Sequence, residues 1–221
     1  MNHSIFNDVL GPVMSGPSSS HSAGCARIGR MTRLLYRKEI THAEVVFEKD
    51  GAYPDTYIGQ GSNYGFTGGL LGFDTDNPRM KDAVEIAKAE GKQILFRQES
   101  LGLHHPNEAR IDIFGDDEKV EMSVLTFSTG GGMFEIVRLN GFEVYIDGYR
   151  RQMFLCVSNE YVSKWNEFLA KETIKYQKEM TAKETLFIIK NYEEEEKTAV
   201  RDAVRQDAGK TVSWFSGDMI R

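Results

Sequence analysis

The sequence predicts an α/β protein, of the α+β type, with two domains over residues 1–148 and 151–221. Apolar residues recur at three- and four-residue spacing from Ser22 to Lys38, which predicts a helix. Alternating apolar runs over residues 109–146, separated by glycine turns, predict a set of strands. The last part of the chain follows the order strand, helix, strand, strand, helix, strand, which is typical of the ferredoxin-like unit.

In the first domain, a loop precedes the Ser22–Lys38 helix because two Gly-Pro pairs interrupt the chain at residues 11–17. After this helix we expect a strand, a helix and five further strands, over residues 41–47, 81–91, 93–97, 109–114, 120–127, 134–139 and 142–146. The first three of these form a strand–helix–strand unit. The glycine-rich residues 51–72 are too irregular for an element to be predicted there.

The second domain begins where the composition changes, around residues 147–151. Four strands and two helices are expected there, the strands over residues 152–158, 173–181, 185–191 and 210–216 and the helices over residues 161–171 and 193–207. The acidic run Glu193–Glu196 falls at the start of the second helix, where carboxylates interact favourably with the helix dipole.

Charge and cysteine content exclude several classes of protein. Lys and Arg total 27 and Asp and Glu total 33, a net charge of −6, which is unlike the basic surface of a nucleic-acid binder. No apolar run reaches the ~18–20 residues that cross a bilayer, and the N-terminus lacks the features of a signal peptide. Two cysteines, Cys25 and Cys156, are too few for a disulfide framework, so a cytoplasmic location is expected. They are also too few to bind an iron–sulfur cluster alone.

The segment Gly16–Gly24, GPSSSHSAG, is the strongest candidate site. It places three hydroxyl groups, at residues 18–20, and the imidazole of His21 directly before the predicted helix. Hydroxyl groups and the free N–H groups of a first helical turn can bind a carboxylate or phosphate, and histidine takes up a proton near neutral pH. The pattern predicts a site that binds a small anion and moves one of its protons. The alternative is a serine N-cap beside a surface histidine.

Three weaker candidates carry open alternatives. The loop His104–Asn107 could orient a substrate, polarise a carbonyl or bind a metal, or it could be a plain turn. Gly130–Gly132 form either a turn or a place where the backbone approaches a ligand closely. Cys25 is either a reactive thiol or a small buried side chain. Motifs for nucleotide binding or for an α/β-hydrolase nucleophile do not occur in the sequence.

Together these motifs resemble the beta subunit of bacterial iron–sulfur L-serine dehydratases, also called L-serine ammonia-lyases. The resemblance covers about the first 146 residues and rests on short segments: Leu10–Pro12, Gly16–Gly24, Arg27–Gly29, Gly68–Asp74, His105–Asn107, Gly130–Gly132 and Asn140–Phe142. Ser22 stands where the family usually has threonine, which keeps a hydroxyl group.

The resemblance implies a domain of the kind also found as an effector-binding domain in some phosphoglycerate dehydrogenases. It also implies a partner alpha subunit that carries a [4Fe–4S] cluster, with no metal ligand on this chain. Serine would lose its α-proton to His21 and its hydroxyl group as water, and the aminoacrylate formed would hydrolyse to pyruvate and ammonia. The residues implied to bind this small amino-acid substrate are Ser18, Ser19, Ser20, His105, Asn107 and Gly131.

Family members of this architecture often end in an ACT domain, an amino-acid sensor with the same element order as residues 151–221. Ser158–Tyr161 stand where such domains usually carry a Pro-Gly turn, so we expect an ACT-like fold whose effector site is in question, with assembly as the alternative role. Two rival functions stay open: a regulatory module that senses a small carboxylate, and a lyase for another β-substituted amino acid. Homodimerisation is a further expectation to test.

Overall fold

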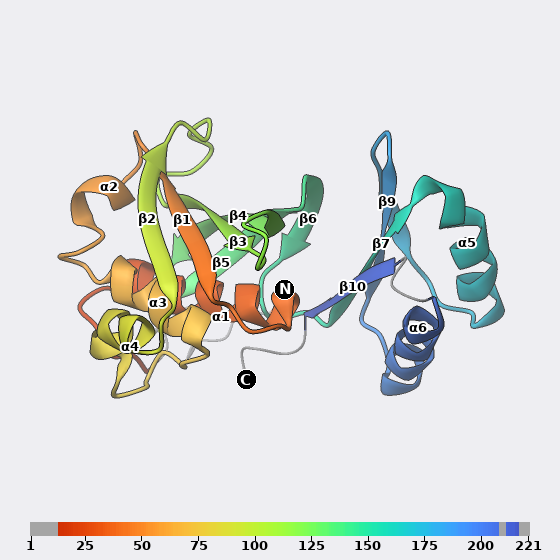
Figure 1. The fold of residues 1–221 in the computed structure, drawn as a ribbon, viewed down its shortest axis with the longest axis horizontal. Coiled ribbons are helices and arrows are strands. Elements are labelled where there is room, and N and C mark those ends of the chain that lie inside the picture. Colours follow the sequence, from red (N-terminus) through yellow and green to blue (C-terminus); the bar gives the residue numbers. More distant parts are fainter. Residues whose placement is uncertain (1–12, 208–210, 217–221) are drawn as a thin grey trace. The chain divides into compact units, whose positions relative to one another are not determined.

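The computed structural model describes residues 13–207 and 211–216, the last six by their backbone alone. The chain divides into two compact units, Met1–Asp147 and Gly148–Arg221 (Figure 1). Each unit contains one sheet with helices packed against it. Among the described residues, every helix is too short or too polar to cross a membrane.

The first unit is built on a six-stranded sheet with the order β2-β1-β3-β4-β5-β6. β1 and β2 are parallel, and all the other neighbours are antiparallel. The strands are β1 (His42–Glu48), β2 (Gln93–Glu99), β3 (Glu108–Phe114), β4 (Val120–Gly130), β5 (Met133–Leu139) and β6 (Phe142–Ile146). Each of them overlaps a predicted strand, and the parallel pair confirms the predicted strand–helix–strand unit.

Helical segments of the first unit gather beside this sheet, and α1 packs on β4 and β5 (Figure 1). They are η2 (Ser19–Ala23), α1 (Gly24–Tyr36), α2 (Tyr53–Thr56), α3 (Ser62–Leu71), η3 (Met80–Asp82) and α4 (Ala83–Ala89). The predicted helix Ser22–Lys38 therefore begins three residues earlier, with one turn of π-helix, and ends at Tyr36. This early start is important because it places Ser19, Ser20 and His21 inside the helical segment.

α3 lies in the glycine-rich stretch for which no element was expected. Glycine disfavours helices in isolation, so the sequence signal there is weak. Packing explains why the helix forms: a Cβ at Gly29 of α1 would lie 2.6 Å from the carbonyl oxygen of Phe66, and a Cβ at Gly69 would collide with the carbonyl oxygen of Ala26. The glycines thus allow the backbones of α1 and α3 to approach closely.

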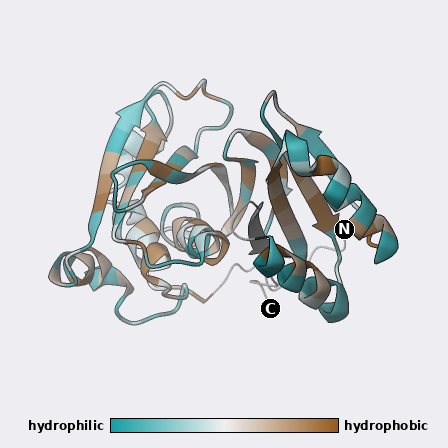
Figure 2. Ribbon diagram, turned by 45° about the vertical axis from the view of Figure 1, so that its right-hand side comes forward, coloured by the Kyte–Doolittle hydropathy of each residue, from teal (hydrophilic) through white to brown (hydrophobic). Residues whose placement is uncertain are grey.

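The second unit has the predicted order of elements around a sheet ordered β10-β7-β9-β8, with all neighbours antiparallel. Its elements are β7 (Gln152–Ser158), η4 (Asn159–Tyr161), α5 (Val162–Lys171), β8 (Gln177–Met180), β9 (Glu184–Lys190), α6 (Glu194–Gln206) and β10 (Thr211–Ser216). Figure 2 shows hydrophobic residues along the strands of this sheet and hydrophilic residues along the helices beside it.

One predicted strand of the second unit, residues 173–181, is too long. The structure has only β8 there, because the chain leaves α5 through a turn. Thr173 adopts a positive φ of 57°, and the N–H of Ile174 donates to the carbonyl oxygen of Leu169 at 2.9 Å. This turn uses the first residues of the stretch and leaves four for the strand.

Candidate functional site

The serine loop forms the start of a helix, as its sequence indicates. Ser18 is the N-cap of η2, and its Oγ accepts a hydrogen bond from the N–H of His21 at 3.2 Å. The N–H groups of Ser19 and Ser20 belong to the first turn, where no earlier carbonyl within the helix can accept from them. The segment begins as a π-helix, a rare form that is found often at functional sites.

His21 is buried, with 7% of its surface exposed. Its Nδ1 lies 3.0 Å from the Oγ of Ser20 and 3.4 Å from the Oγ of Ser18. Its Nε2 is buried and has no hydrogen-bond partner within the described part of the chain. The alternative of a serine N-cap beside a surface histidine is therefore half right: the cap exists, but the histidine is not on the surface.

Burial lowers the pKa of His21 below its ordinary value of 6.5, because the charged imidazolium loses hydration. The ring is therefore neutral at neutral pH. A neutral imidazole whose Nδ1 faces two hydroxyl groups can keep its hydrogen on Nδ1, which leaves the lone pair of Nε2 ready to accept a proton. This is the protonation state that a general base requires.

Two fully buried residues, Tyr53 and Cys25, lie beside the imidazole. The ring of Tyr53 meets the ring of His21 edge-on, with centroids 5.2 Å apart. The Sγ of Cys25 lies 3.4 Å from the hydroxyl oxygen of Tyr53. Burial raises the pKa of Cys25 to about 12 and the pKa of Tyr53 well above 10, so both side chains keep their protons at neutral pH. Cys25 is thus a small buried side chain rather than a reactive thiolate.

Ser128, on β4, joins the serine loop to Asn107. Its Oγ donates to the carbonyl oxygen of Ser20 at 2.8 Å, and its N–H donates to the carbonyl oxygen of Asn107 at 3.1 Å. The Nδ2 of Asn107 in turn donates to the carbonyl oxygen of Ser128 at 3.4 Å. The Oδ1 of Asn107 is buried and unpartnered among the described residues, like the Nε2 of His21. The structure therefore connects two segments that the sequence suggested separately.

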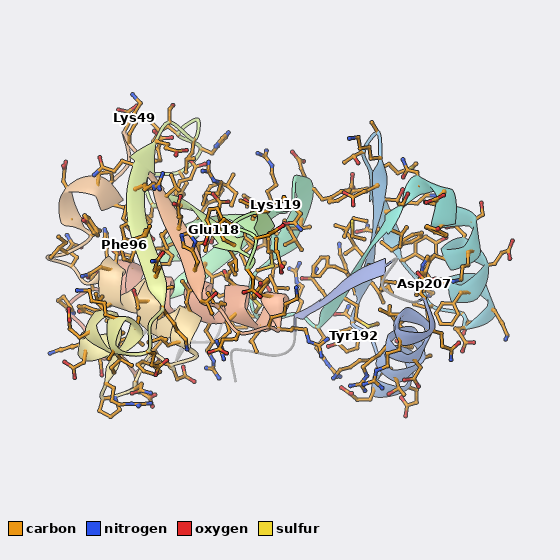
Figure 3. The ribbon with its side chains drawn as sticks, viewed as in Figure 1. Lys49, Phe96, Glu118, Lys119, Tyr192 and Asp207 are labelled. Atoms are coloured by element: carbon orange, nitrogen blue, oxygen red, sulfur yellow. The ribbon has the colours of Figure 1, made fainter. Side chains whose placement is uncertain are left out.

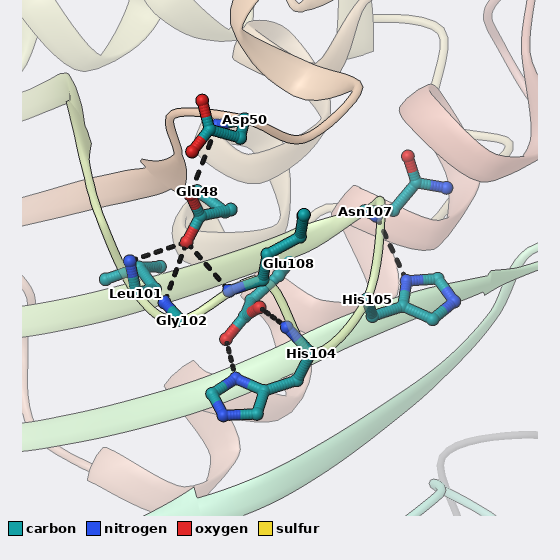
Figure 4. A network of polar contacts seen from close by, with 9 residues as sticks. Glu48, Asp50, Leu101, Gly102, His104, His105, Asn107 and Glu108 are labelled. Carbon is teal, nitrogen blue, oxygen red and sulfur yellow. Dashed lines mark hydrogen bonds and ion pairs between the residues drawn. The ribbon is translucent and has the colours of Figure 1, made fainter.

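His105 and His104 are held by their own loop (Figure 4). The Nδ1 of His105 accepts from the N–H of Asn107 at 3.0 Å, and its ring stacks on Phe127 with centroids 5.3 Å apart. His104 bonds to the buried carboxylate of Glu108 through its Nδ1, at 2.9 Å, and through its N–H, at 2.7 Å. Both rings have a structural task, and neither has a buried nitrogen without a partner within the described chain.

Gly131 and Gly132 form the turn between β4 and β5, where Gly130 pairs with Met133. Their φ values, 60° and 78°, match a tight hairpin turn that favours glycine at both central positions. The Nη1 of Arg27 on α1 donates to the carbonyl oxygen of Gly132 at 3.0 Å, which ties this hairpin to the helix that follows His21.

The sequence did not point to Tyr53 or to the bridging role of Ser128. The bond between Ser128 and Ser20 spans 108 positions of the chain, and serine is too common for its type alone to signal such a contact. Within the described residues there is no group of three or more His, Cys, Asp or Glu side chains that could hold a metal ion.

Comparisons with known proteins match this chain to two curated relatives. It is 48% identical over 145 residues to a "Probable L-serine dehydratase, beta chain" of Bacillus subtilis (strain 168), which covers 66% of this chain and 64% of that protein. It is 35% identical over 142 residues to an "L-serine dehydratase, beta chain" of Peptoniphilus asaccharolyticus, covering 64% of this chain and 63% of that protein. The chain is a homologue of L-serine dehydratase beta chains.

The chain spans just under two thirds of the length of both relatives. No family model matches it. The predicted resemblance to L-serine dehydratase beta chains is thereby confirmed. In this beta-chain homologue, the structure brings His21, the serine loop and Asn107 together through Ser128, whereas it assigns His105 and Gly131 evident local roles in a loop and a turn.

Proposed function

We propose that this chain is the beta subunit of an amino-acid dehydratase that converts L-serine into pyruvate and ammonia. The observation that carries the proposal is the Nε2 of His21, which is buried, unpartnered among the described residues and part of a neutral ring. In the proposed reaction this nitrogen takes the α-proton of serine while the bond from the β-carbon to the hydroxyl oxygen breaks. The proton held by His21 then balances the hydroxide that is lost, so the elimination releases one molecule of water. The aminoacrylate released then hydrolyses to pyruvate and ammonia.

The substrate carboxylate is proposed to bind at the start of η2. The N–H groups of Ser19 and Ser20 and the hydroxyl group of Ser18 supply donors there, and the positive end of the helix dipole favours an anion. The buried Oδ1 of Asn107 is suited to accept from the substrate ammonium group, because it has no hydrogen-bond partner among the described residues and Asn107 is joined to the serine loop through Ser128. His105 and Gly131 support the proposed binding site by fixing the loop and the hairpin.

The α-proton of an amino acid is weakly acidic, so a base alone acts slowly. A [4Fe–4S] cluster on a partner alpha subunit would supply Lewis acidity at the leaving hydroxyl group. The described residues of this chain do not fit the cluster, because they offer no grouped ligands, and Cys25 and Cys156 are buried and protonated. In this proposal the cluster therefore belongs to the partner subunit, and this chain contributes the base and the binding of the carboxylate.

The two units carry further proposals. Residues 1–148 form the serine dehydratase beta domain, and residues 151–221 form an ACT-like domain whose role is assembly or effector binding. We propose a cytoplasmic enzyme of two different subunits. Homodimerisation through this chain is a further proposal, which the measured mass of the complex would test.

Reconstitution tests the proposal. The chain is co-expressed anaerobically with an alpha subunit of an L-serine dehydratase, and pyruvate release from L-serine, L-threonine and L-cysteine is measured. We expect turnover with L-serine that neither chain shows alone. Turnover with another amino acid only would identify a related lyase. Binding of serine by this chain, without turnover in a well-formed complex, would identify the regulatory module instead.

A further inference from the structure

Glu48, the last residue of β1, has a carboxylate that is buried and saturated with backbone donors (Figure 4). The residue is 1% exposed. Its Oε1 accepts from the N–H of Asp50 at 3.1 Å, and its Oε2 accepts from three successive N–H groups, of Leu101 at 2.6 Å, Gly102 at 2.9 Å and Leu103 at 3.1 Å. The neighbouring Lys49 points outward (Figure 3), with just over half of its side chain exposed. One buried charge thus organises a whole loop.

The charge on Glu48 persists because these donors replace water. Burial alone would raise the pKa of Glu48, but the four backbone hydrogen bonds outweigh burial and lower it. The loop adopts an unusual conformation around the carboxylate, with φ values of 111° at Gly102 and 48° at Leu103. A positive φ at leucine is unfavourable, so the conformation depends on the contacts that hold it.

The same loop is fastened at two further points. The N–H of Ala52 donates to the carbonyl oxygen of Pro106 at 2.7 Å. The turn that makes this contact needs Gly51, because a Cβ there would lie 2.6 Å from that carbonyl oxygen. Glu108 holds the loop from the other side, through both hydrogen bonds to His104.

Both segments held by Glu48 lead to the candidate site. The loop ends at Asn107, which bonds to Ser128 and through it to the serine loop. The turn after Glu48 leads within five residues to Tyr53, whose ring edge meets His21. We propose that Glu48 is a positioning residue: its carboxylate fixes the loop over residues 100–107 so that Asn107 keeps its hydrogen bonds to Ser128, which in turn bonds to the serine loop that carries His21. This inference rests on the function proposed above for the His21 site.

The test uses the full chain and two variants of equal charge. Glu48→Gln removes the charge and places an amide NH₂ among N–H donors. Glu121→Gln is the control, since Glu121 accepts from Tyr36 and Lys38, away from the loop. Amide hydrogen exchange and the side-chain amide signal of Asn107 are recorded on the chain alone. In the complex with the alpha subunit, kcat and KM for L-serine are measured.

We expect Glu48→Gln to speed exchange at Leu101, Gly102 and Leu103 by at least about tenfold and to shift the Asn107 side-chain signal. It should lower kcat by roughly 10–100-fold, with a smaller change in KM, because small displacements of a reacting geometry cost that much. Glu121→Gln should do none of this. If Glu48→Gln does not fold, Gly51→Ala, which pushes the turn from Pro106, should produce the same Asn107 shift and loss of kcat.

Unchanged exchange at Leu101–Leu103 would show that the carboxylate does not hold the loop. Faster exchange without a shift of the Asn107 signal would show that the loop does not position the site. The same conclusion would follow if Glu48→Gln had faster exchange but the same kcat and KM as the control Glu121→Gln. Either result overturns the inference. If the wild-type complex fails to turn over serine, the proposed function fails, and the Asn107 signal on the chain alone still decides the role of Glu48.

Discussion

The two histidine-bearing segments that the sequence singles out as candidate sites differ in the hydrogen bonds that their rings make. In the serine loop, His21 has one nitrogen among hydroxyl groups and the other buried without a partner among the described residues. In the loop before β3, His105 uses Nδ1 to accept from its own backbone and stacks on Phe127, while His104 bonds to Glu108. Similar residue types in two loops therefore have opposite tasks.

This difference teaches how to separate a chemical histidine from a structural one. A buried polar atom without a partner is costly, so it persists where a ligand or a partner satisfies it or where function requires it. Among the described residues, His21 and His42 both meet that description and His105 does not, but of the two only His21 lies beside the hydroxyl groups of the serine loop, whereas His42 stacks on Phe114 and bonds to Glu118. Three variants and a pH profile test this contrast, beginning with the largest expected effect.

Replacing His21 by Gln should reduce turnover of L-serine by at least about 10²–10⁴-fold, because the general base is lost. The kinetics of the complex with the alpha subunit measure it. His42→Gln is the matched control: the Nε2 of His42 is also buried and unpartnered among the described residues, but His42 stacks on Phe114 and bonds to Glu118. Equal activity in both variants would remove His21 from the reaction.

Replacing Asn107 by Ala should lower kcat/KM on the order of 10–100-fold, since a buried hydrogen-bonding group in contact with the substrate contributes about 1–3 kcal/mol. Steady-state kinetics with L-serine give the value. Asn140→Ala serves for comparison, because the Oδ1 of Asn140 accepts from the N–H of Ser123 in a distant turn. A loss of activity no greater than that of the control would separate Asn107 from the site.

The pH profile should reflect the lowered pKa of His21. A base with a lowered pKa is neutral at pH 7 and gains a proton only as the pH falls below that pKa, so kcat/KM should fall on the acid side with an apparent pKa below 6.5. Initial rates between pH 5 and 8 measure the profile. An acid limb centred above 6.5 would contradict a desolvated imidazole.

Replacing His105 by Ala should have the smallest effect on catalysis, less than about tenfold in kcat. The main result should be a loss of about 1–2 kcal/mol in the free energy of unfolding, from the hydrogen bond to Asn107 and the stacking on Phe127. Urea denaturation of the chain measures the stability. A loss of turnover as large as that of His21→Gln would show that His105 takes part in catalysis and would contradict the contrast between the two loops.

Much of the fold was predictable because its strands alternate clearly and its turns contain glycine, as at Asn140-Gly141. The helix α3 could not be predicted, because Gly65, Gly68 and Gly69 weaken the sequence signal for a helix. Its stability comes instead from packing against α1. The strand predicted over residues 173–181 was too long for a related reason, because the turn at Thr173 depends on how α5 ends.

The candidate site was predictable in its composition but not in its geometry. A run of serines and a histidine before a helix indicates anion binding, and this much can be read from residue types alone. The same residue types do not reveal that Tyr53 packs against His21 or that Ser128 bonds to Ser20, since these contacts join positions far apart in the chain. Burial of the imidazole, which determines its pKa, is a property of the tertiary structure.

The central claim is that His21 is a neutral imidazole with an available lone pair on Nε2. A two-bond proton–nitrogen correlation spectrum of the nitrogen-15-labelled chain measures this directly, with the five histidines assigned through variants such as His21→Gln. We predict that His21 carries its hydrogen on Nδ1 at pH 7 and titrates below 6.5. A hydrogen on Nε2, or a pKa at or above 6.5, would contradict the account.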